Sequence, residues 1–498
     1  MENFNQIPSF PKNLAYNLKK LQGSINKQRV KILADNTSYK STQQIRFNLP
    51  RGAILDLRSL VIYATGATSG TGSSTSYVHF GRLGLHSLIE NLTVSVNNIT
   101  LSSIQSYNFL YNLLFDMEGG SIDQATKRMI TELYDPSVNF SSEAADSGST
   151  VAKNENKIIA KYTGKVDGTT ANDSAVKFCA NNFLGFLGSC SCPCISTDDI
   201  GDIQITITLA NTGALFYSVP AAATAVPTFT GLDFTLSDVY LTVERLTFTN
   251  SLYLQLKQAQ LMSDGLDVGF YDYYTITGST ITKSSGCALN ASINSASLNQ
   301  LIGTFRRSDY QTIKPLLLYG NNSKTSSEAK SFDEYLANVV TNTNTSTGCD
   351  VLGFGSNLGD GFNNTAYHQR CANDITGTSW AVNSVNLSGY SVPPVEIFNN
   401  TIQSLGFNNI DVATAGLHPG CRSLEHWKKY YFCDVISLEN ISQDNNFWVS
   451  GFDGQNGGIV INYNATFAST NAGTVYPYVF AQSTKVMNVK AGRALDII

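Results

Sequence analysis

Apolar and polar residues alternate strictly in several segments of the chain. Residues 45–49, 92–96, 203–209 and 239–243 all follow this pattern. With a period of two, alternate side chains lie on a buried face and on a solvent-exposed face of a strand. Such alternation is typical of antiparallel sheets, whereas the buried strands of a parallel sheet are continuously apolar. We therefore expect antiparallel β structure over residues 42–250.

A few segments have helical spacing instead, with apolar residues three and four positions apart. Short helices of this kind are expected over residues 103–116, 298–305, 332–339 and 398–405.

The second half repeats the general plan of the first. Residues 459–467 alternate again after a Gly-rich turn, and residues 475–489 predict a closing strand in which Pro477 marks an edge or a bulge. Both halves have early strands, short helices and strong late strands. Many short strands with long connections predict two eight-stranded sandwiches. The long polar loops are expected at about residues 64–78, 118–175, 211–232 and 340–395.

Composition narrows the class of protein. Of the 498 residues, 42% are apolar, 11% are aromatic and only 14% are charged, and the net charge is −5. Disordered chains and coiled coils need more charge, and a general nucleic-acid binder needs an excess of basic residues. The aromatic share favours strands and interfaces.

The first 40 residues differ from the rest. They carry seven basic and two acidic residues, a net charge of +5, and Leu14, Leu18, Leu21 and Ile25 share one face of a helix. We predict a basic interface arm over residues 1–40, to which Lys19 and Lys20 contribute charge, ahead of a first domain at 41–250 and a second at 251–498. The alternative is a solvated extension.

No stretch near the N-terminus has the apolar length of a signal peptide, and no apolar run approaches the ~20 residues of a membrane helix. We expect a soluble chain made in the cytosol. The nine cysteines are scattered, so most are expected to be free thiols.

A search for catalytic motifs finds none of the common patterns. The five histidines have no paired metal-ligand spacing, and no nucleophile elbow or phosphate-binding loop is present. Two carboxylates of a glycosidase need no sequence proximity, so a hydrolase stays a minor alternative. We predict that the chain is not an enzyme and has no cofactor.

One cysteine cluster could carry chemistry. Cys179, Cys190, Cys192 and Cys194 place four thiols within 16 residues. A single residue between ligands is tighter than the usual zinc spacing, whereas in an extended segment alternate thiols face one side. Zinc binding and a disulfide or redox role are minor alternatives to simple packing.

The order of several short segments resembles that of double-jelly-roll major capsid proteins of tailless icosahedral dsDNA viruses. The resemblance spans nearly the whole chain. It is nearest to polinton-like viruses and virophages, with large algal DNA viruses next. The segments that carry it are residues 44–50, 55–60, 89–96, 103–116, 183–188, 203–209, 297–301, 448–453 and 492–495.

The resemblance implies an all-β chain of two consecutive eight-stranded antiparallel jelly rolls, with a few short helices and long loops. It implies a structural role: a homotrimer forms a pseudo-hexagonal capsomer, which tiles an icosahedral capsid with neighbouring capsomers, penton proteins and minor capsid proteins. The arm would reach these neighbours, an internal membrane or the genome. The family supplies no catalytic residue, metal or small-molecule substrate. The expected location is the virion, after synthesis in the host cytoplasm without secretion.

The main rival is an extracellular β-sandwich carbohydrate-binding protein or adhesin. It would explain the aromatic residues and the polar loops. It predicts a signal sequence, however, and residues 1–11 do not contain one. A capsid role is therefore favoured.

Overall fold

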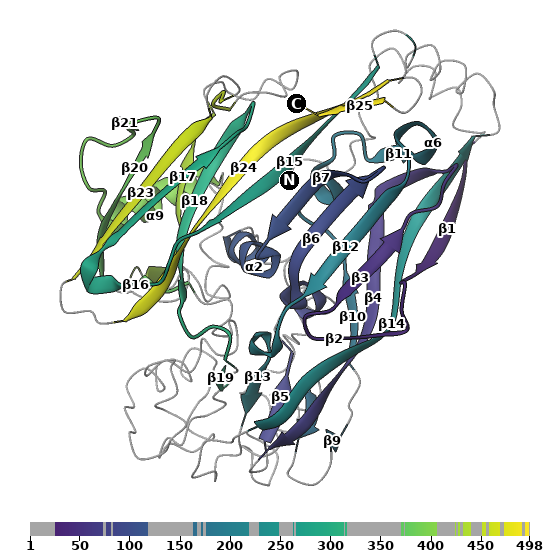
Figure 1. The fold of residues 1–498 in the computed structure, drawn as a ribbon, viewed down its shortest axis with the longest axis horizontal. Helices are drawn as coiled ribbons and strands as arrows, with labels where there is room; N and C mark the ends of the chain where they lie inside the picture. The colour runs from purple at the N-terminus through teal and green to yellow at the C-terminus, as the bar shows by residue number, and fades with distance from the viewer. Residues whose placement is uncertain are drawn as a thin grey trace, which may run out of the picture.

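A computed structural model gives the fold of the chain (Figure 1). Strands make up most of the residues that it describes. The described residues are 25–72, 76–80, 83–117, 163–166, 171–172, 176–218, 229–248, 262, 265–312, 314–315, 370–372, 374–405, 424, 427–428, 432–439, 451–454, 458–468, 473–490 and 494–497.

Eight strands of the first half form two four-stranded antiparallel sheets. If these strands are numbered one to eight along the chain, their spatial orders are 1-8-3-6 and 2-7-4-5. These orders are those of a jelly roll, in which hydrogen-bonded neighbours come from distant parts of the chain. The eight strands are β1 (Ile25–Leu33), β3 (Gln44–Asn48), β4 (Ile54–Gly72), β6 (Ile89–Val96), β7 (Ile99–Gln105), β10 (Val176–Ala180), β12 (Ile203–Leu209) and β14 (Phe229–Phe248).

Eight strands of the second half repeat the same two orders. The predicted fold of two consecutive eight-stranded jelly rolls is therefore confirmed, and the halves correspond strand by strand. The eight strands are β15 (Leu266–Thr277), β17 (Cys287–Ile293), β18 (Leu298–Arg307), β20 (Ile375–Val382), β21 (Val385–Asn386), β22 (Asp434–Ser437), β23 (Ile459–Phe467) and β24 (Thr474–Lys490).

Shorter elements complete the two sandwiches. Four short strands extend the larger sheets: β2 (Ser38–Lys40), β11 (Cys194–Ser196), β16 (Ile281–Thr282) and β25 (Ala494–Ile497). The helices within the described residues are α2 (Tyr107–Met117), α5 (Phe186–Ser189), α6 (Thr197–Ile200), α9 (Pro394–Ser404) and the 3-10 turns η2 (Gly84–Leu88), η3 (Thr212–Ala214) and η4 (Lys283–Ser285).

Strict alternation in the sequence corresponds to half-buried strands. Every second residue of β12, from Ile203 to Leu209, is buried, and β3 and β23 alternate in the same way. The buried side chains face the core between the two sheets of each jelly roll. The prediction of antiparallel strands at these segments is confirmed.

The predicted helix over residues 298–305 is wrong, because this segment is the strand β18. Leu298, Leu301 and Phe305 pack in the core of the second jelly roll, whereas Ile302 belongs to the apolar cluster of the first. Both faces of the strand are buried, so its apolar residues lose the period of two and mimic helical spacing.

The other helix predictions have different outcomes. The helix near 103–116 is present as α2 but begins at Tyr107, and Ile104 lies in β7. The helix predicted over residues 398–405 is confirmed as α9. The predicted helix at 332–339 lies outside the described residues.

Pro477 lies in the central strand β24 rather than at an edge of the sheet. Gly278 N donates a hydrogen bond to Pro477 O just beyond the end of β15. A proline, which lacks a donor, is tolerated there because the ladder with β15 ends at Thr277 and Tyr478.

A separate five-stranded sheet gathers connections from both halves at one end of the molecule. Its order is β19-β13-β5-β8-β9. Three of the predicted long loops contribute strands to it, whereas part of the fourth, 340–395, contains β20 and β21. The five strands are β5 (Ser76–His79), β8 (Thr163–Val166), β9 (Ala171–Asn172), β13 (Phe216–Ser218) and β19 (Lys314–Pro315).

The first sandwich begins earlier than the predicted boundary at residue 41. β1 pairs along its whole length with β14, from Ile25 opposite Phe248 to Leu33 opposite Tyr240. Ile25, the first residue of β1, lies beside the last residue of β14. The first residues of β14 follow β13 of the five-stranded sheet, so β1 begins at the end of β14 that points away from that sheet. The predicted boundary between 250 and 251 falls between the last strand of the first sandwich and the first strand of the second.

Candidate assembly surfaces

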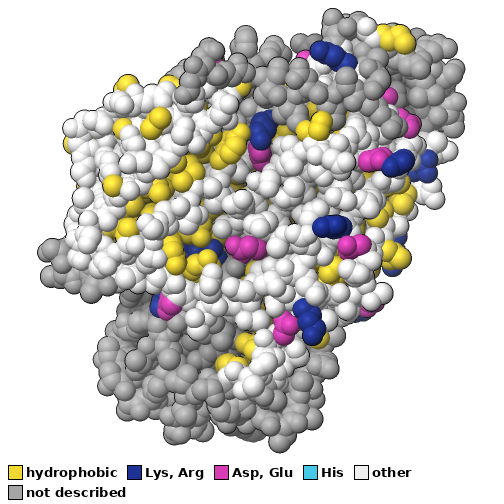
Figure 2. All heavy atoms as spheres, viewed as in Figure 1, with side chains coloured by type: hydrophobic (Ala, Val, Ile, Leu, Met, Phe, Trp, Pro, Cys, Tyr) yellow, Lys and Arg dark blue, Asp and Glu magenta, His cyan; other side chains and the backbone are white. Residues whose placement is uncertain are grey.

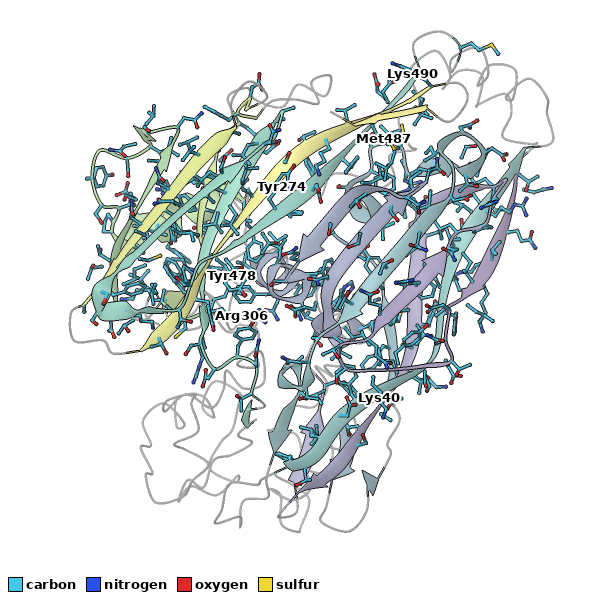
Figure 3. The ribbon with its side chains drawn as sticks, viewed as in Figure 1. Lys40, Tyr274, Arg306, Tyr478, Met487 and Lys490 are labelled. Carbon is cyan, nitrogen blue, oxygen red and sulfur yellow. The ribbon has the colours of Figure 1, made fainter. Side chains whose placement is uncertain are left out.

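The two jelly rolls meet through α2, which packs against the larger sheet of the second half. The ring of Phe109 lies 5.2 Å from that of Tyr478 and 6.0 Å from that of Phe480. The guanidinium of Arg306 lies 3.7 Å from the ring centre of Tyr310 and 4.8 Å from that of Phe109. Arg306 and Tyr478 lie in the middle of the molecule (Figure 3), so aromatic and cationic groups fill the junction.

A buried polar network also crosses the junction. Ser102 Oγ of the first jelly roll donates to Asp272 Oδ1 at 2.7 Å, and Lys485 Nζ donates to Asp272 Oδ2 at 2.5 Å. Burial alone would lower the pKa of Lys485, but the carboxylate of Asp272 outweighs it and raises the pKa above its usual value. The charged pair lies within the second jelly roll, and its carboxylate accepts the hydrogen bond that Ser102 donates across the junction.

The outer edge of β15 is covered by the first jelly roll. Ser191 N donates to Gly269 O at 2.9 Å, and Tyr271 N donates to Ser189 Oγ at 2.8 Å. The ring of Phe186 meets that of Phe270 edge-on at 5.1 Å. These bonds satisfy an otherwise open strand edge, so the junction joins backbone as well as side chains.

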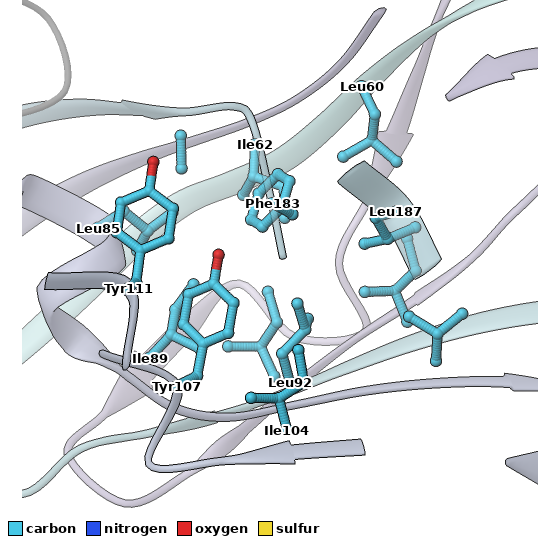
Figure 4. Close-up of a cluster of buried hydrophobic side chains, with 14 of the residues drawn as sticks. Leu60, Ile62, Leu85, Ile89, Leu92, Ile104, Tyr107, Tyr111, Phe183 and Leu187 are labelled. Atoms are coloured by element: carbon cyan, nitrogen blue, oxygen red, sulfur yellow. The ribbon is translucent and has the colours of Figure 1, made fainter. Parts of the chain in front are cut away.

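An aromatic cluster anchors α2 inside the first jelly roll. Tyr107 and Tyr111 project from α2 toward Phe183 (Figure 4). His86 stacks on Tyr111 at 3.9 Å, donates from Nε2 to Asn181 O at 2.8 Å and accepts from the Tyr107 hydroxyl at Nδ1. Burial lowers the pKa of His86 to about 3, so the ring is neutral near pH 7.

The second jelly roll has its own buried titratable group, Asp434 on β22. Trp380 Nε1 donates to Asp434 Oδ2 at 2.9 Å. Burial raises the pKa of Asp434 to about 6. This effect outweighs the hydrogen bond from Trp380, which lowers the pKa. This carboxyl is almost completely buried inside the sandwich.

The fold places Cys179 away from the other three cysteines of the predicted cluster, which stay close together. Cys179 on β10 pairs with Tyr63, and Cys194 on β11 pairs with Asp56. Cys190 Sγ donates to Cys192 O at 3.1 Å, and burial raises the pKa of Cys190 to about 12 and that of Cys194 to about 11. All four are free thiols, and within the described part of the chain no three His, Cys, Asp or Glu residues form a metal-binding group.

The predicted interface arm falls mostly outside the described residues. Leu14, Leu18, Lys19, Lys20 and Leu21 are among those that the structure does not describe. Ile25, the last residue of the predicted helical face, is instead the first residue of β1.

Two exposed apolar surfaces lie far apart on the molecule, and the sequence analysis did not identify either. One is the end of β1, where the single side chain of Leu33 is 69% exposed. The other, which we call the 385–395 patch, lies around β21 and the start of α9. Figure 2 shows apolar side chains gathered over the second jelly roll, while charged ones lie mainly over the first and the junction. The 385–395 patch consists of Val385, Leu387, Tyr390 and Val395, which are 64%, 47%, 58% and 66% exposed.

Membrane-spanning segments were also sought. Among the helices that the structure describes, none combines the length and the apolar character needed to cross a bilayer.

Comparison with known proteins gives matches only at the level of structure. No protein-family model and no curated protein matches the chain. PBCV-1 VP54, fitted into a reconstruction of the virophage Sputnik, is similar at 9% identity and a TM-score of 0.53, over 95% of this chain and 96% of that one.

Two further capsid structures agree with this match. The Faustovirus major capsid protein aligns at 9% identity and a TM-score of 0.52, over 94% of this chain and 91% of that one. A subunit of the PBCV-1 capsid model aligns at 10% identity and a TM-score of 0.51, over 95% and 96%. The chain has the double jelly-roll fold of these viral major capsid proteins.

Proposed function

We propose that the chain is the major capsid protein of a tailless icosahedral dsDNA virus and acts as a structural protein. The observation that carries this proposal is the duplication: two jelly rolls of identical strand order, joined by a packed and hydrogen-bonded junction. A rigid pair of equivalent walls suits a shell, because each chain supplies two similar sides to its neighbours.

Three chains would supply six jelly rolls and close a pseudo-hexagonal capsomer. The low charged share of the chain, 14%, and its aromatic share of 11% suit the wide interfaces of obligate trimers, whose cores are depleted of charge. Capsomers would then meet neighbouring capsomers, penton proteins and minor capsid proteins through weaker contacts.

The two ends of the molecule suggest the orientation of the subunit. The five-stranded sheet collects loops from both halves at one end, and we assign that end to the outer surface. β1 begins at the opposite end, so residues 1–24 would enter the shell at its base. There the basic arm could bind minor proteins, an internal membrane or the genome.

The arm hypothesis has a direct test. Deletion of residues 1–24 leaves β1 intact, so trimers should still form while shells fail to close. A matched deletion of residues 1–8 removes only one acidic residue and no basic ones, and should have little effect. Normal shells from the longer deletion would refute a role of the arm in assembly.

The capsid proposal itself is tested by electron microscopy of the purified chain. Hexagonal particles are expected, together with closed shells at high concentration. The rival binding protein predicts isolated monomers that bind glycans on an array. Monomers with specific glycan binding would contradict the capsid role and support the rival.

A further inference from the structure

The repeated strand order allows equivalent surfaces of the two halves to be compared. In the second jelly roll, Thr275, Phe480, Ile302 and Val435 stand side by side across β15, β24, β18 and β22. Neighbouring residues such as Leu301 and Ala481 face the core of that jelly roll, so this row lies on the outer face of its sheet.

The first jelly roll covers this outer row. Phe480, Ile302 and Val435 belong to its apolar cluster, and Phe109 of α2 lies against Phe480. Thr275 Oγ1 donates to Gln105 O, at the end of β7, at 2.8 Å. The fifth strand of the first jelly roll, β7, and the helix after it, α2, therefore dock on the outer face of the larger sheet of the second jelly roll.

The first jelly roll has an equivalent outer row, which we call the Leu33 row. It consists of residues in register across β1, β14, β4 and β10, which correspond to the four strands of the covered row: Leu33, Tyr240, Tyr63 and Cys179. Tyr63 and Tyr240 stack at 5.0 Å, and Lys31 Nζ lies 3.9 Å from the ring centre of Tyr240. Within one chain Leu33 stays largely exposed.

The docking elements are repeated as well. α2 follows the fifth strand of the first jelly roll, and α9 follows β21, the fifth strand of the second. Residues 107–114 of α2 are all buried, whereas α9 exposes Val395, Asn399 and Gln403 along one face. The 385–395 patch occupies the place that β7 and α2 have in the first half.

The Leu33 row and the 385–395 patch lie on opposite sides of the chain. In Figure 1, β21 is at the far side of the second jelly roll and β1 is at the far side of the first. Two different surfaces at opposite ends can join copies only head to tail, and such a contact closes into a ring when the rotation allows it.

We infer that the 385–395 patch of one copy docks on the Leu33 row of a second copy and repeats the contact that joins the two halves within a chain. This inference rests on the proposed capsomer and names the surfaces that would hold it together. Charge agrees with it, because Lys27, Arg29 and Lys31 share the outer face of β1 with Leu33, and Glu396 lies in the first turn of α9. Six equivalent contacts, three within chains and three between them, would close the ring.

Charge substitutions on each surface test the inference. Val395→Asp and Leu33→Asp place a carboxylate in the proposed contact, and both side chains are exposed in the single chain, so folding should be retained. Ile99→Asp is the matched control, because Ile99 is 45% exposed and lies on neither surface. Light scattering of the full-length chains at micromolar concentration should give three times 54.0 kDa, or 162 kDa, for the wild type and Ile99→Asp. The two test variants should give 54 kDa.

The outcomes separate this inference from the proposed function. A trimeric wild type with two trimeric test variants would overturn the inferred surfaces and leave the capsomer standing, whereas a monomeric wild type would contradict the capsomer itself. If either variant aggregates, hydrogen exchange on the wild type decides. Peptides 25–33 and 385–396 should exchange more slowly in the trimer than in the diluted monomer, and unchanged exchange in both would overturn the inference.

Discussion

The ring of Phe109 on α2 lies 5.2 Å from the ring of Tyr478 on β24, and this pair joins the first jelly roll to the second. Both side chains are almost completely buried. The contact places the helix of one half on the outer face of the other half's sheet, so the spacing of the two sandwiches depends on it.

Truncation of this aromatic anchor should destabilise the whole chain. Phe109→Ala is expected to lower the free energy of unfolding by about 3–5 kcal/mol, because it removes a buried ring and leaves a cavity at the junction. Denaturant unfolding followed by tryptophan fluorescence measures the effect. Phe398→Ala is the comparison, since Phe398 is only partly buried and contacts Trp427 within the second jelly roll. An equal loss in both variants would contradict the special role of the junction.

Asp434 should make the second jelly roll less stable as the pH rises. Its pKa is raised from 3.8 to about 6, so the folded state holds the proton more tightly than the unfolded state. Stability is therefore full below pH 3.8 and is lost as the pH rises toward 6, by about 3 kcal/mol in all. Asp434→Asn should remove this loss while its amide oxygen still accepts from Trp380. The difference in unfolding free energy between variant and wild type, measured from pH 4 to pH 7, tests this. A constant difference would show that Asp434 does not titrate in this range.

His86 should have the opposite effect in acid. Its pKa is lowered from 6.5 to about 3, so the unfolded state binds the proton first as the pH falls. Stability is present above pH 6.5 and should fall by about 2 kcal/mol by pH 5, with the loss continuing toward pH 3. In His86→Gln this acid-dependent part should vanish, whatever the fixed cost of the substitution. Unfolding midpoints at pH 7 and pH 5 give the comparison, and an identical acid loss in the variant would contradict the assignment.

Gly303 on β18 should not tolerate a side chain. A Cβ at this position would lie 2.7 Å from Tyr463 Cζ and 2.8 Å from Trp380 Cζ2, closer than real contacts allow. Gly303→Ala should cost about 1–3 kcal/mol through overpacking. Gly389→Ala is the control, because nothing lies within 4 Å of the added carbon. Thermal unfolding of the two variants measures the contrast, and equal melting temperatures would show that the core around Trp380 yields.

The strands that could be predicted from the sequence are those with one buried face and one face toward solvent. β3 and β12 alternate because their outward side chains are exposed in β3 and only partly buried in β12, so their period is visible in the sequence alone. β18 was wrongly predicted as a helix by the same reasoning, because its second face is covered by the other jelly roll. Burial by a distant part of the chain leaves no period in the local sequence.

The candidate surfaces were less predictable for a similar reason. Leu33 and Tyr240 are 207 positions apart, and only the register of β1 with β14 brings them opposite each other. The basic residues of β1 predicted an arm, because the charge of Lys27, Arg29 and Lys31 hid the alternation of these residues with Val30 and Ile32, which marks a strand. Charged side chains along an exposed edge strand are a common protection against wrong pairing, and they conceal the strand in the sequence.

The most direct test of the account is the solution mass of the purified wild-type chain, measured by light scattering across micromolar concentrations. The account predicts a stable species of 162 kDa, three times the 54.0 kDa of one chain. A single species of 54 kDa throughout that range would contradict the central claim that this double jelly roll is built to form a capsomer.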